Sequence, residues 1–191
     1  MTPRQRRRGV RLAAAVALPL LAGCAGTGTI DYSFVESVYS SYELSYAGDG
    51  RDFAVTVRGG LLDGDRSDPV KNAVIAAMRR QPGWFRPNFT TYPGKSARPD
   101  YRVSWLLGVP AETPLRALCD DSVAIPQGKS VAVLAGVCRQ HRLLSYAGGS
   151  LYGIGASDAP GFANLIKVTT RVLMPNRDPS SQGNNDHDFG P

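Results

Sequence analysis

Alternating apolar and polar residues along the chain predict several strands. Residues 52–58 alternate and end at Gly59-Gly60, which is typical of a half-buried strand. Residues 101–109 show the clearest alternation of the chain. Residues 130–138 are apolar almost throughout, so we expect a central strand covered on both faces, with a short neighbour over 143–146.

Helical spacing of apolar residues predicts two helices. The first runs over 68–80, where Asp68 is well placed as an N-cap and Pro69 as the first helical residue. Residues 162–173 are harder to assign, because they alternate like a strand but also place apolar side chains on one helical face. The β-branched run 168–170 favours a strand, whereas the flanking prolines favour a helix with a defined start and stop, so we predict a helix.

The order β-α-β-β-β-α predicts an α+β fold, in which two helices pack on one face of a small antiparallel or mixed sheet. A length of 191 residues predicts a single domain. We place this domain at 52–175, after a tether and aromatic segment at 24–51. The polar composition of 176–191 predicts a disordered tail, because it cannot bury enough apolar surface to offset the loss of chain entropy.

Aromatic residues gather in two segments beside these elements. Residues 32–46 are rich in tyrosine, and the proline-rich loop around 84–92 holds Trp84, Phe85, Phe89 and Tyr92. A broken alternation over 32–38 allows a strand there. Both segments are interpreted either as a surface for a protein partner or as side chains packed on the domain edge, and their exposure would distinguish the two.

The first 23 residues have the three parts of a secretory signal: an arginine-rich start, an apolar run and small residues at a cleavage site. The apolar run from Leu12 to Ala22 is too short for a membrane span, which needs roughly 20 apolar residues. The segment Leu21-Ala22-Gly23-Cys24 matches a bacterial lipobox. It predicts cleavage before Cys24 and acylation of that cysteine. Acylation would anchor the protein to a membrane, since each methylene buried in the bilayer contributes about 0.8 kcal/mol.

The predicted cleavage changes the charge of the protein. The formal charge of +6 suggests an acidic partner, but five arginines and no acidic residue precede Cys24. Removing these five from the 22 basic residues leaves 17 against 16 acidic residues, a net of +1. A nearly neutral chain has no electrostatic footprint for nucleic acid, so we expect no nucleic-acid partner.

The lipobox, the single α+β body and the helix from Asp68 followed by the strand from Tyr101 resemble small proteobacterial envelope lipoproteins of unknown function. The resemblance covers roughly residues 1–175. It implies a lipid anchor at Cys24 facing the periplasm, and Ala25 resembles the sorting pattern for the outer membrane. The implied role is a non-catalytic accessory or structural component of a transport, secretion or surface-assembly system, with an envelope protein as partner. A second non-catalytic hypothesis is a structural lipoprotein that binds the cell wall.

Cys119 and Cys138 are the two remaining cysteines. Export would place them in an oxidising compartment, which favours a disulfide between them. A metal site has little support because the chain holds only two histidines and no Cys-x-x-Cys motif. We therefore predict a disulfide, no metal and no cofactor.

Candidate catalytic residues are few. Ser150 is out of register for a Gly-x-Ser-x-Gly nucleophile elbow. Asp120 and Asp121 follow Cys119, and a disulfide would bring them toward the strand end before His141. The alternative hypothesis is therefore an envelope hydrolase or small-ligand-binding protein with a cleft near Asp120, Asp121 and His141, although acid–base chemistry needs a geometry that sequence does not show. We expect a non-catalytic protein.

Overall fold

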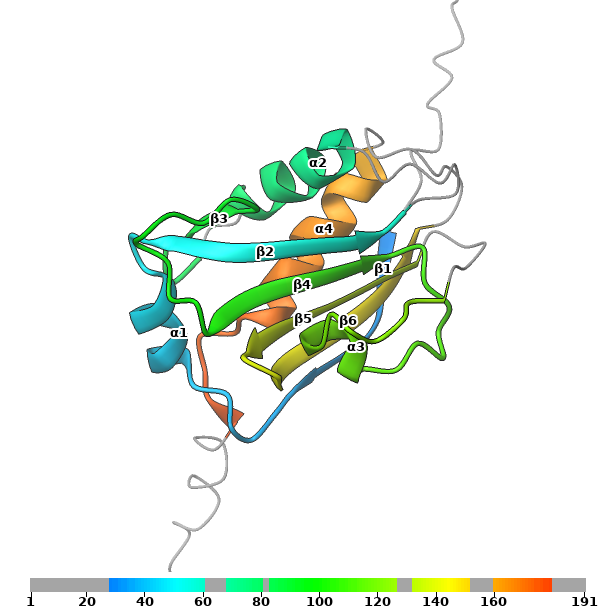
Figure 1. The fold of residues 1–191 in the computed structure, drawn as a ribbon. Coiled ribbons are helices and arrows are strands. Elements are labelled where there is room, and N and C mark those ends of the chain that lie inside the picture. The colour runs from blue at the N-terminus through cyan, green and yellow to red at the C-terminus, as the bar shows by residue number, and fades with distance from the viewer. Residues whose placement is uncertain (1–27, 61–67, 81–82, 127–131, 152–159, 180–191) are drawn as a thin grey trace, which may run out of the picture.

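A computed structural model describes residues 28–60, 68–80, 83–126, 132–151 and 160–179 (Figure 1). Within these ranges six strands form one sheet in the order β1-β6-β5-β4-β2-β3. Strands β4, β5, β6 and β1 are antiparallel neighbours, whereas β2 and β3 run parallel to β4. The sheet is therefore mixed, and the predicted α+β class is confirmed. The strands are β1 (Gly28–Val35), β2 (Asp52–Gly59), β3 (Asn88–Thr90), β4 (Tyr101–Leu107), β5 (Ala132–Arg139) and β6 (Arg142–Leu151).

The two long helices pack side by side on one face of the sheet (Figure 1). They are α2 (Asp68–Arg79) and α4 (Pro160–Leu173). The segment that could have been strand or helix is therefore a helix. Phe162, Leu165 and Ile166 are fully buried on its inner side, and this burial outweighs the preference of β-branched residues for strands. Thr170 adapts to the helix by donating its hydroxyl hydrogen to the Ile166 carbonyl, at 2.7 Å.

The main core lies between these helices and the sheet. Trp105 of β4 is fully buried there, and the neighbouring inward positions of β2 and β5 surround it. The opposite face holds a smaller buried cluster beneath the four-residue helix α3 (Arg116–Cys119). Strand β5 thus lies between two apolar layers, as its continuous apolar sequence predicts. The smaller cluster consists of Leu106, Val109, Ala117, Leu118, Cys119, Leu134 and Cys138.

The N-terminal aromatic segment is part of the same folded body. β1 adds to the edge of the sheet beside β6, and helix α1 (Ser41–Gly48) lies at the end of the sheet where β2 and β4 begin (Figure 1). Ser40 is the N-cap of α1, and its hydroxyl accepts the Glu43 amide hydrogen. The sheet therefore begins at Gly28, whereas the sequence analysis placed the start of the domain at residue 52.

The first part of the polar tail packs against α1. The Tyr39 hydroxyl donates to the Pro175 carbonyl at 2.6 Å, and the Ser41 amide donates to the Asp178 carboxylate at 2.5 Å. Burial raises the pKa of Tyr39, and the nearby charge of Asp178 adds to that effect. The predicted disordered tail thus begins with residues that contact α1, and its remainder, residues 180–191, lies outside the described ranges, where disorder stays a prediction.

Strand β2 ends in a conformation that suits glycine. Gly59 has φ of 85°, in the left-handed region, and a Cβ there would overlap the carbonyl oxygen of Leu107 on β4. Gly60 then donates its amide hydrogen to the same carbonyl at 3.1 Å. The glycine pair thus closes the parallel β2–β4 ladder by a close backbone approach.

Candidate functional site

The predicted disulfide joins α3 to β5. Cys119 and Cys138 are bonded at an S–S distance of 2.06 Å, with their Cα atoms 5.6 Å apart. Both side chains are buried in the smaller cluster. Cys119 is the last residue of α3 and Cys138 the next-to-last residue of β5, so the segment after Cys119 starts near the strand end that precedes His141.

The two acidic residues that follow Cys119 have separate partners. Asp120 accepts hydrogen bonds from the Ser122 amide at 3.0 Å and the Ser122 hydroxyl at 2.6 Å. These bonds lower the pKa of Asp120, with a smaller contribution from the charge of His141. Asp121 instead lies beside the guanidinium groups of Arg58 and Arg102, with its Oδ1 3.5 Å and 3.9 Å from them.

The other two predicted site residues lie apart. His141 follows Gln140 in the turn between β5 and β6, within an open hollow lined by Arg139, Gln140, His141 and Arg142. Ser150 is at the opposite end of β6, where its hydroxyl donates to the Asp31 carboxylate at 2.5 Å. At about 3.4 Å per residue, the eight steps along the strand from Arg142 to Ser150 span roughly 27 Å. Ser150 therefore cannot share a catalytic site with His141. The charge of His141 does act on Asp120, but no hydrogen bond or ion pair joins these two side chains among the described residues.

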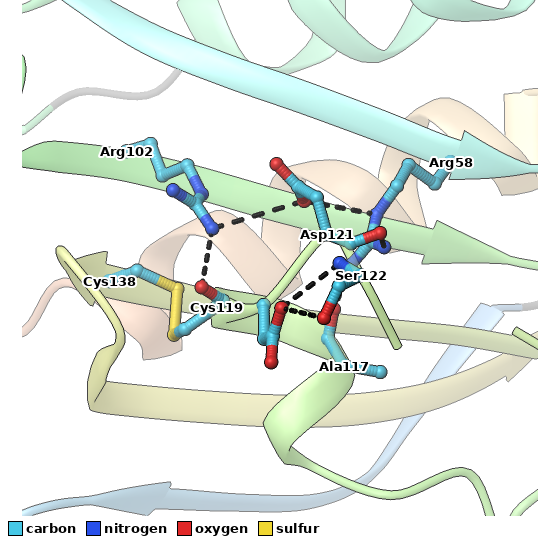
Figure 2. Close-up of polar contacts among 8 residues, drawn as sticks. Arg58, Arg102, Ala117, Cys119, Asp121, Ser122 and Cys138 are labelled. Atoms are coloured by element: carbon cyan, nitrogen blue, oxygen red, sulfur yellow. Dashed lines mark hydrogen bonds and ion pairs between the residues drawn. A yellow bond between two sulfur atoms is a disulfide. The ribbon is translucent and has the colours of Figure 1, made fainter. Parts of the chain in front are cut away.

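Arg58 and Arg102 form an arginine clamp that sequence analysis did not identify. Figure 2 shows the two side chains reaching from β2 and β4 toward α3 and Asp121. Arg102 donates to the Cys119 carbonyl at 2.6 Å, and Arg58 donates to the Ala117 carbonyl. Because both carbonyls belong to α3, the clamp neutralises the negative end of this helix and holds it on the sheet.

Two buried hydroxyl groups lie between the arginines of the clamp. Thr56 and Ser104 face each other across the β2–β4 ladder, and neither side-chain oxygen has a hydrogen-bond partner among the described residues. The clamp itself is occupied, since its guanidiniums already contact main-chain carbonyls and the Asp121 carboxylate. We therefore assign the clamp to the docking of α3. Its sequence signal was the placement of Arg58 and Arg102 on the polar side of alternating strands.

The aromatic segments divide between the surface and the interior. Tyr42 and Tyr92 are 79% and 81% exposed, and Tyr46 on α1 stacks with Arg98, whose guanidinium lies 4.7 Å from the ring centroid. Phe85 and Phe89 are buried and pack against Phe53. The segments therefore contain both exposed and buried aromatic side chains, and a protein partner for the exposed ones stays a prediction.

Asp52 organises the loop that carries the second aromatic segment. Its carboxylate accepts hydrogen bonds from the Asn88 side chain at 2.6 Å and from the Gly94 amide at 2.8 Å. The bond from Asn88 is the main cause of the lowered pKa of Asp52, followed by the bond from Gly94. Asn88 at the start of β3 and Gly94 after its end are thus both held by the first residue of β2.

A cavity lies where this loop meets the C-terminal ends of α2 and α4. It encloses about 520 Å³. Trp84 donates its indole hydrogen to the Met174 carbonyl at 2.9 Å and packs on Phe85, with ring centroids 4.5 Å apart. We call it the Trp84 cavity; it is lined by Met78, Arg79, Gly83, Trp84, Phe85, Arg86, Pro87, Phe89, Thr170, Arg171 and Met174.

Comparison of the chain with known proteins finds no matching family model, no similar curated protein and no similar solved structure. Within the described ranges, no cluster of three or more His, Cys, Asp or Glu side chains is arranged to hold a metal ion. No helix in the described part of the chain has the length and apolarity needed to cross a bilayer.

Proposed function

We propose that this chain is a lipid-anchored lipoprotein of a bacterial envelope, facing the periplasm from the outer membrane. Its role is that of a non-catalytic accessory component of a transport, secretion or surface-assembly system. The observation that carries the proposal is the lipobox Leu21-Ala22-Gly23-Cys24. The Cys119–Cys138 bridge supports it, because disulfides persist in oxidising compartments such as the periplasm.

The position of β1 gives the anchor a structural consequence. β1 begins at Gly28, only four residues after Cys24. At about 3.5 Å per residue, this link reaches at most roughly 14 Å. An acyl group on Cys24 would therefore hold the sheet end at Gly28 close to the bilayer, and the end that carries α1 and the Trp84 cavity would face away from it.

Partner binding is the role that the exposed aromatic residues support. Tyr42 on α1 and Tyr92 on the neighbouring loop expose most of their side chains to solvent. Aromatic residues are enriched at protein interfaces, where they supply large contact areas. The acidic residues that the catalytic alternative needs already have internal partners, namely Ser122 for Asp120 and the arginine clamp for Asp121. These contacts favour a binding role over hydrolysis.

The anchor is tested by the substitution Cys24→Ser in cells given an alkyne analogue of palmitate. The unchanged chain is expected to label and to fractionate with the outer membrane, and Cys24→Ser is expected to lose both properties. The matched control is Thr27→Ser, a conservative change outside the lipobox that keeps Cys24 and both bridge cysteines, and it should still label. Labelling of Cys24→Ser at the unchanged level would refute the anchor.

The partner is tested by placing a photo-crosslinking residue at Tyr42 or Tyr92 in intact cells. We expect one envelope protein to be captured from both positions. Glu112 is an exposed control position on another loop and should not capture it. If neither tyrosine position captures an envelope protein while the anchor test succeeds, the accessory role is wrong although the lipoprotein assignment stands.

A further inference from the structure

The floor of the Trp84 cavity is apolar and buried. Met78 and Phe89 come from the end of α2 and from β3, and Met174 follows the end of α4. All three side chains are buried in the main core, and the half-buried Trp84 forms a wall. Methionine and aromatic side chains suit an apolar ligand, because thioethers adapt in shape and rings supply large contact areas.

The mouth of the cavity is cationic. Arg79, Arg86 and Arg171 line it, and the described lining residues include no carboxylate. Arg79 is occupied, since it donates to the Phe89 carbonyl at 2.8 Å and 3.1 Å and to the Asn88 side chain at 3.1 Å. The guanidiniums of Arg86 and Arg171 are exposed and have no hydrogen-bond or ion-pair partner among the described residues.

We propose that the Trp84 cavity binds an anionic amphiphile. The apolar chain of the ligand lies on the floor formed by Met78, Phe89 and Met174. Its carboxylate or phosphate head lies at the mouth, where Arg86 and Arg171 donate hydrogen bonds to it. The volume of about 520 Å³ falls within the range of small-molecule sites, roughly 300–1,000 Å³.

The net field at the mouth favours an anion. The C-terminal ends of α2 and α4 both lie at the cavity, and each contributes the equivalent of about half a negative charge. Three arginine side chains supply three full positive charges at the same place. The Asp49 carboxylate, which accepts the Arg86 amide hydrogen at 2.8 Å, adds one negative charge nearby. The three arginines outweigh this charge and the two helix ends together, and a cationic or neutral head group lacks this attraction.

The proposal does not depend on the acylation of Cys24. Its test uses the chain from residue 24 onward with Cys24→Ser, which contains every described residue and needs no detergent. Trp84 is the reporter, because the only other tryptophan, Trp105, is fully buried in the core. Dodecanoate, dodecyl phosphate, dodecyltrimethylammonium, acetate and inorganic phosphate are titrated separately, each below any micelle-forming concentration.

We expect dodecanoate or dodecyl phosphate to shift the Trp84 emission saturably, whereas the cation and the two chainless anions do not at the same concentrations. A response to one of the two anionic amphiphiles alone identifies the head group. Shortening the chain should weaken binding by about fourfold per methylene, the equivalent of about 0.8 kcal/mol. The variant Arg86→Gln with Arg171→Gln should bind about tenfold more weakly, because charged hydrogen bonds at an exposed mouth are partly screened.

The matched control is Arg142→Gln, which changes the exposed first residue of β6 and should bind like the unchanged chain. Trp84→Phe should lose the emission signal but still bind by calorimetry. Equal binding of the cationic and anionic amphiphiles, or equal affinity of the double arginine variant and the control, would overturn the proposal. So would the absence of binding by calorimetry for both anionic amphiphiles.

Discussion

Removal of the Cys119–Cys138 bridge should lower the free energy of unfolding by about 3 kcal/mol. The bridge joins residues separated by 19 positions, and the chain-entropy relation gives about 3 kcal/mol for a loop of that size. Domains of this kind are stable by only about 5–15 kcal/mol, so the loss is a large fraction of the total. The variant is Cys119→Ala with Cys138→Ala, whose small side chains keep the smaller cluster apolar.

The assay is urea unfolding at pH 7, followed by circular dichroism. The double alanine variant should unfold at lower urea, with a larger dependence of the free energy on urea because its unfolded chain is more expanded. The reduced unchanged chain should behave in the same way. Leu118→Ala is the control from the same helix: it should lose about 2–5 kcal/mol by leaving a cavity, without that larger dependence.

A loss below about 1 kcal/mol on removal of the bridge would refute this reasoning. It would mean that α3 is held by the arginine clamp and its buried side chains, with no measurable contribution from loop closure. A bridge-free variant whose urea dependence equals that of the unchanged chain would contradict the entropic mechanism, even if the stability loss were as large as expected.

Two further predictions concern a glycine and a carboxylate. Gly59→Ala should lower the free energy of unfolding in urea by more than about 2 kcal/mol, because a Cβ would overlap the Leu107 carbonyl. Gly50 also has a positive φ but open surroundings, so Gly50→Ala should lower it by only about 1–2 kcal/mol. Similar losses for both variants would contradict the close backbone approach at Gly59. Asn88→Ala should raise the pKa of Asp52 toward its ordinary value in an NMR titration. Because the folded pKa of Asp52 is lowered, its contribution to stability is present above about pH 4 and is lost as the pH falls below that value. Asn88→Ala should make this loss of stability at low pH smaller. An unchanged pKa of Asp52 in the variant would show that the Asn88 hydrogen bond does not lower it.

Periodicity predicted the elements whose buried sides are continuous. Strand β4 and helix α2 fall where the alternation and the helical spacing placed them. The apolar run of β5 indicated a strand covered on both faces of the sheet, and β5 does lie between the main core and the smaller cluster. These predictions succeeded because the pattern of each segment directly reflects the layers that pack on it.

The elements that sequence analysis missed depend on distant partners. Helix α1 buries little apolar surface of its own, and Tyr39 beside it bonds to Pro175, more than a hundred residues away. Its one local signal was the pair Ser40 and Glu43, which has the spacing of a capping box. Helix α3 is too short for any periodicity and is held by the disulfide and the clamp.

The candidate sites also differ in whether the signal for them is local in the sequence or depends on distant segments. The disulfide was predictable because the expected export would place the two cysteines in an oxidising compartment, where disulfides persist. The Trp84 cavity was not, since its walls come from the end of α2, the loop around Trp84 and the end of α4. The aromatic loop marked one wall, but only the tertiary packing brings Arg171 and Met174 to it.

The pairing of β1 with β6 has a consequence for the order in which the chain folds. β1 spans Gly28–Val35 and β6 spans Arg142–Leu151. If the chain is exported as proposed, the first strand of the described sheet to leave the translocation channel must therefore wait for the last one. The hairpin of β5 and β6 joins segments that follow each other directly and can form as soon as both emerge. We expect β1, with Tyr32 and Phe34, to stay unpaired until then, so export would expose its edge to chaperones for longer than any other part of the sheet.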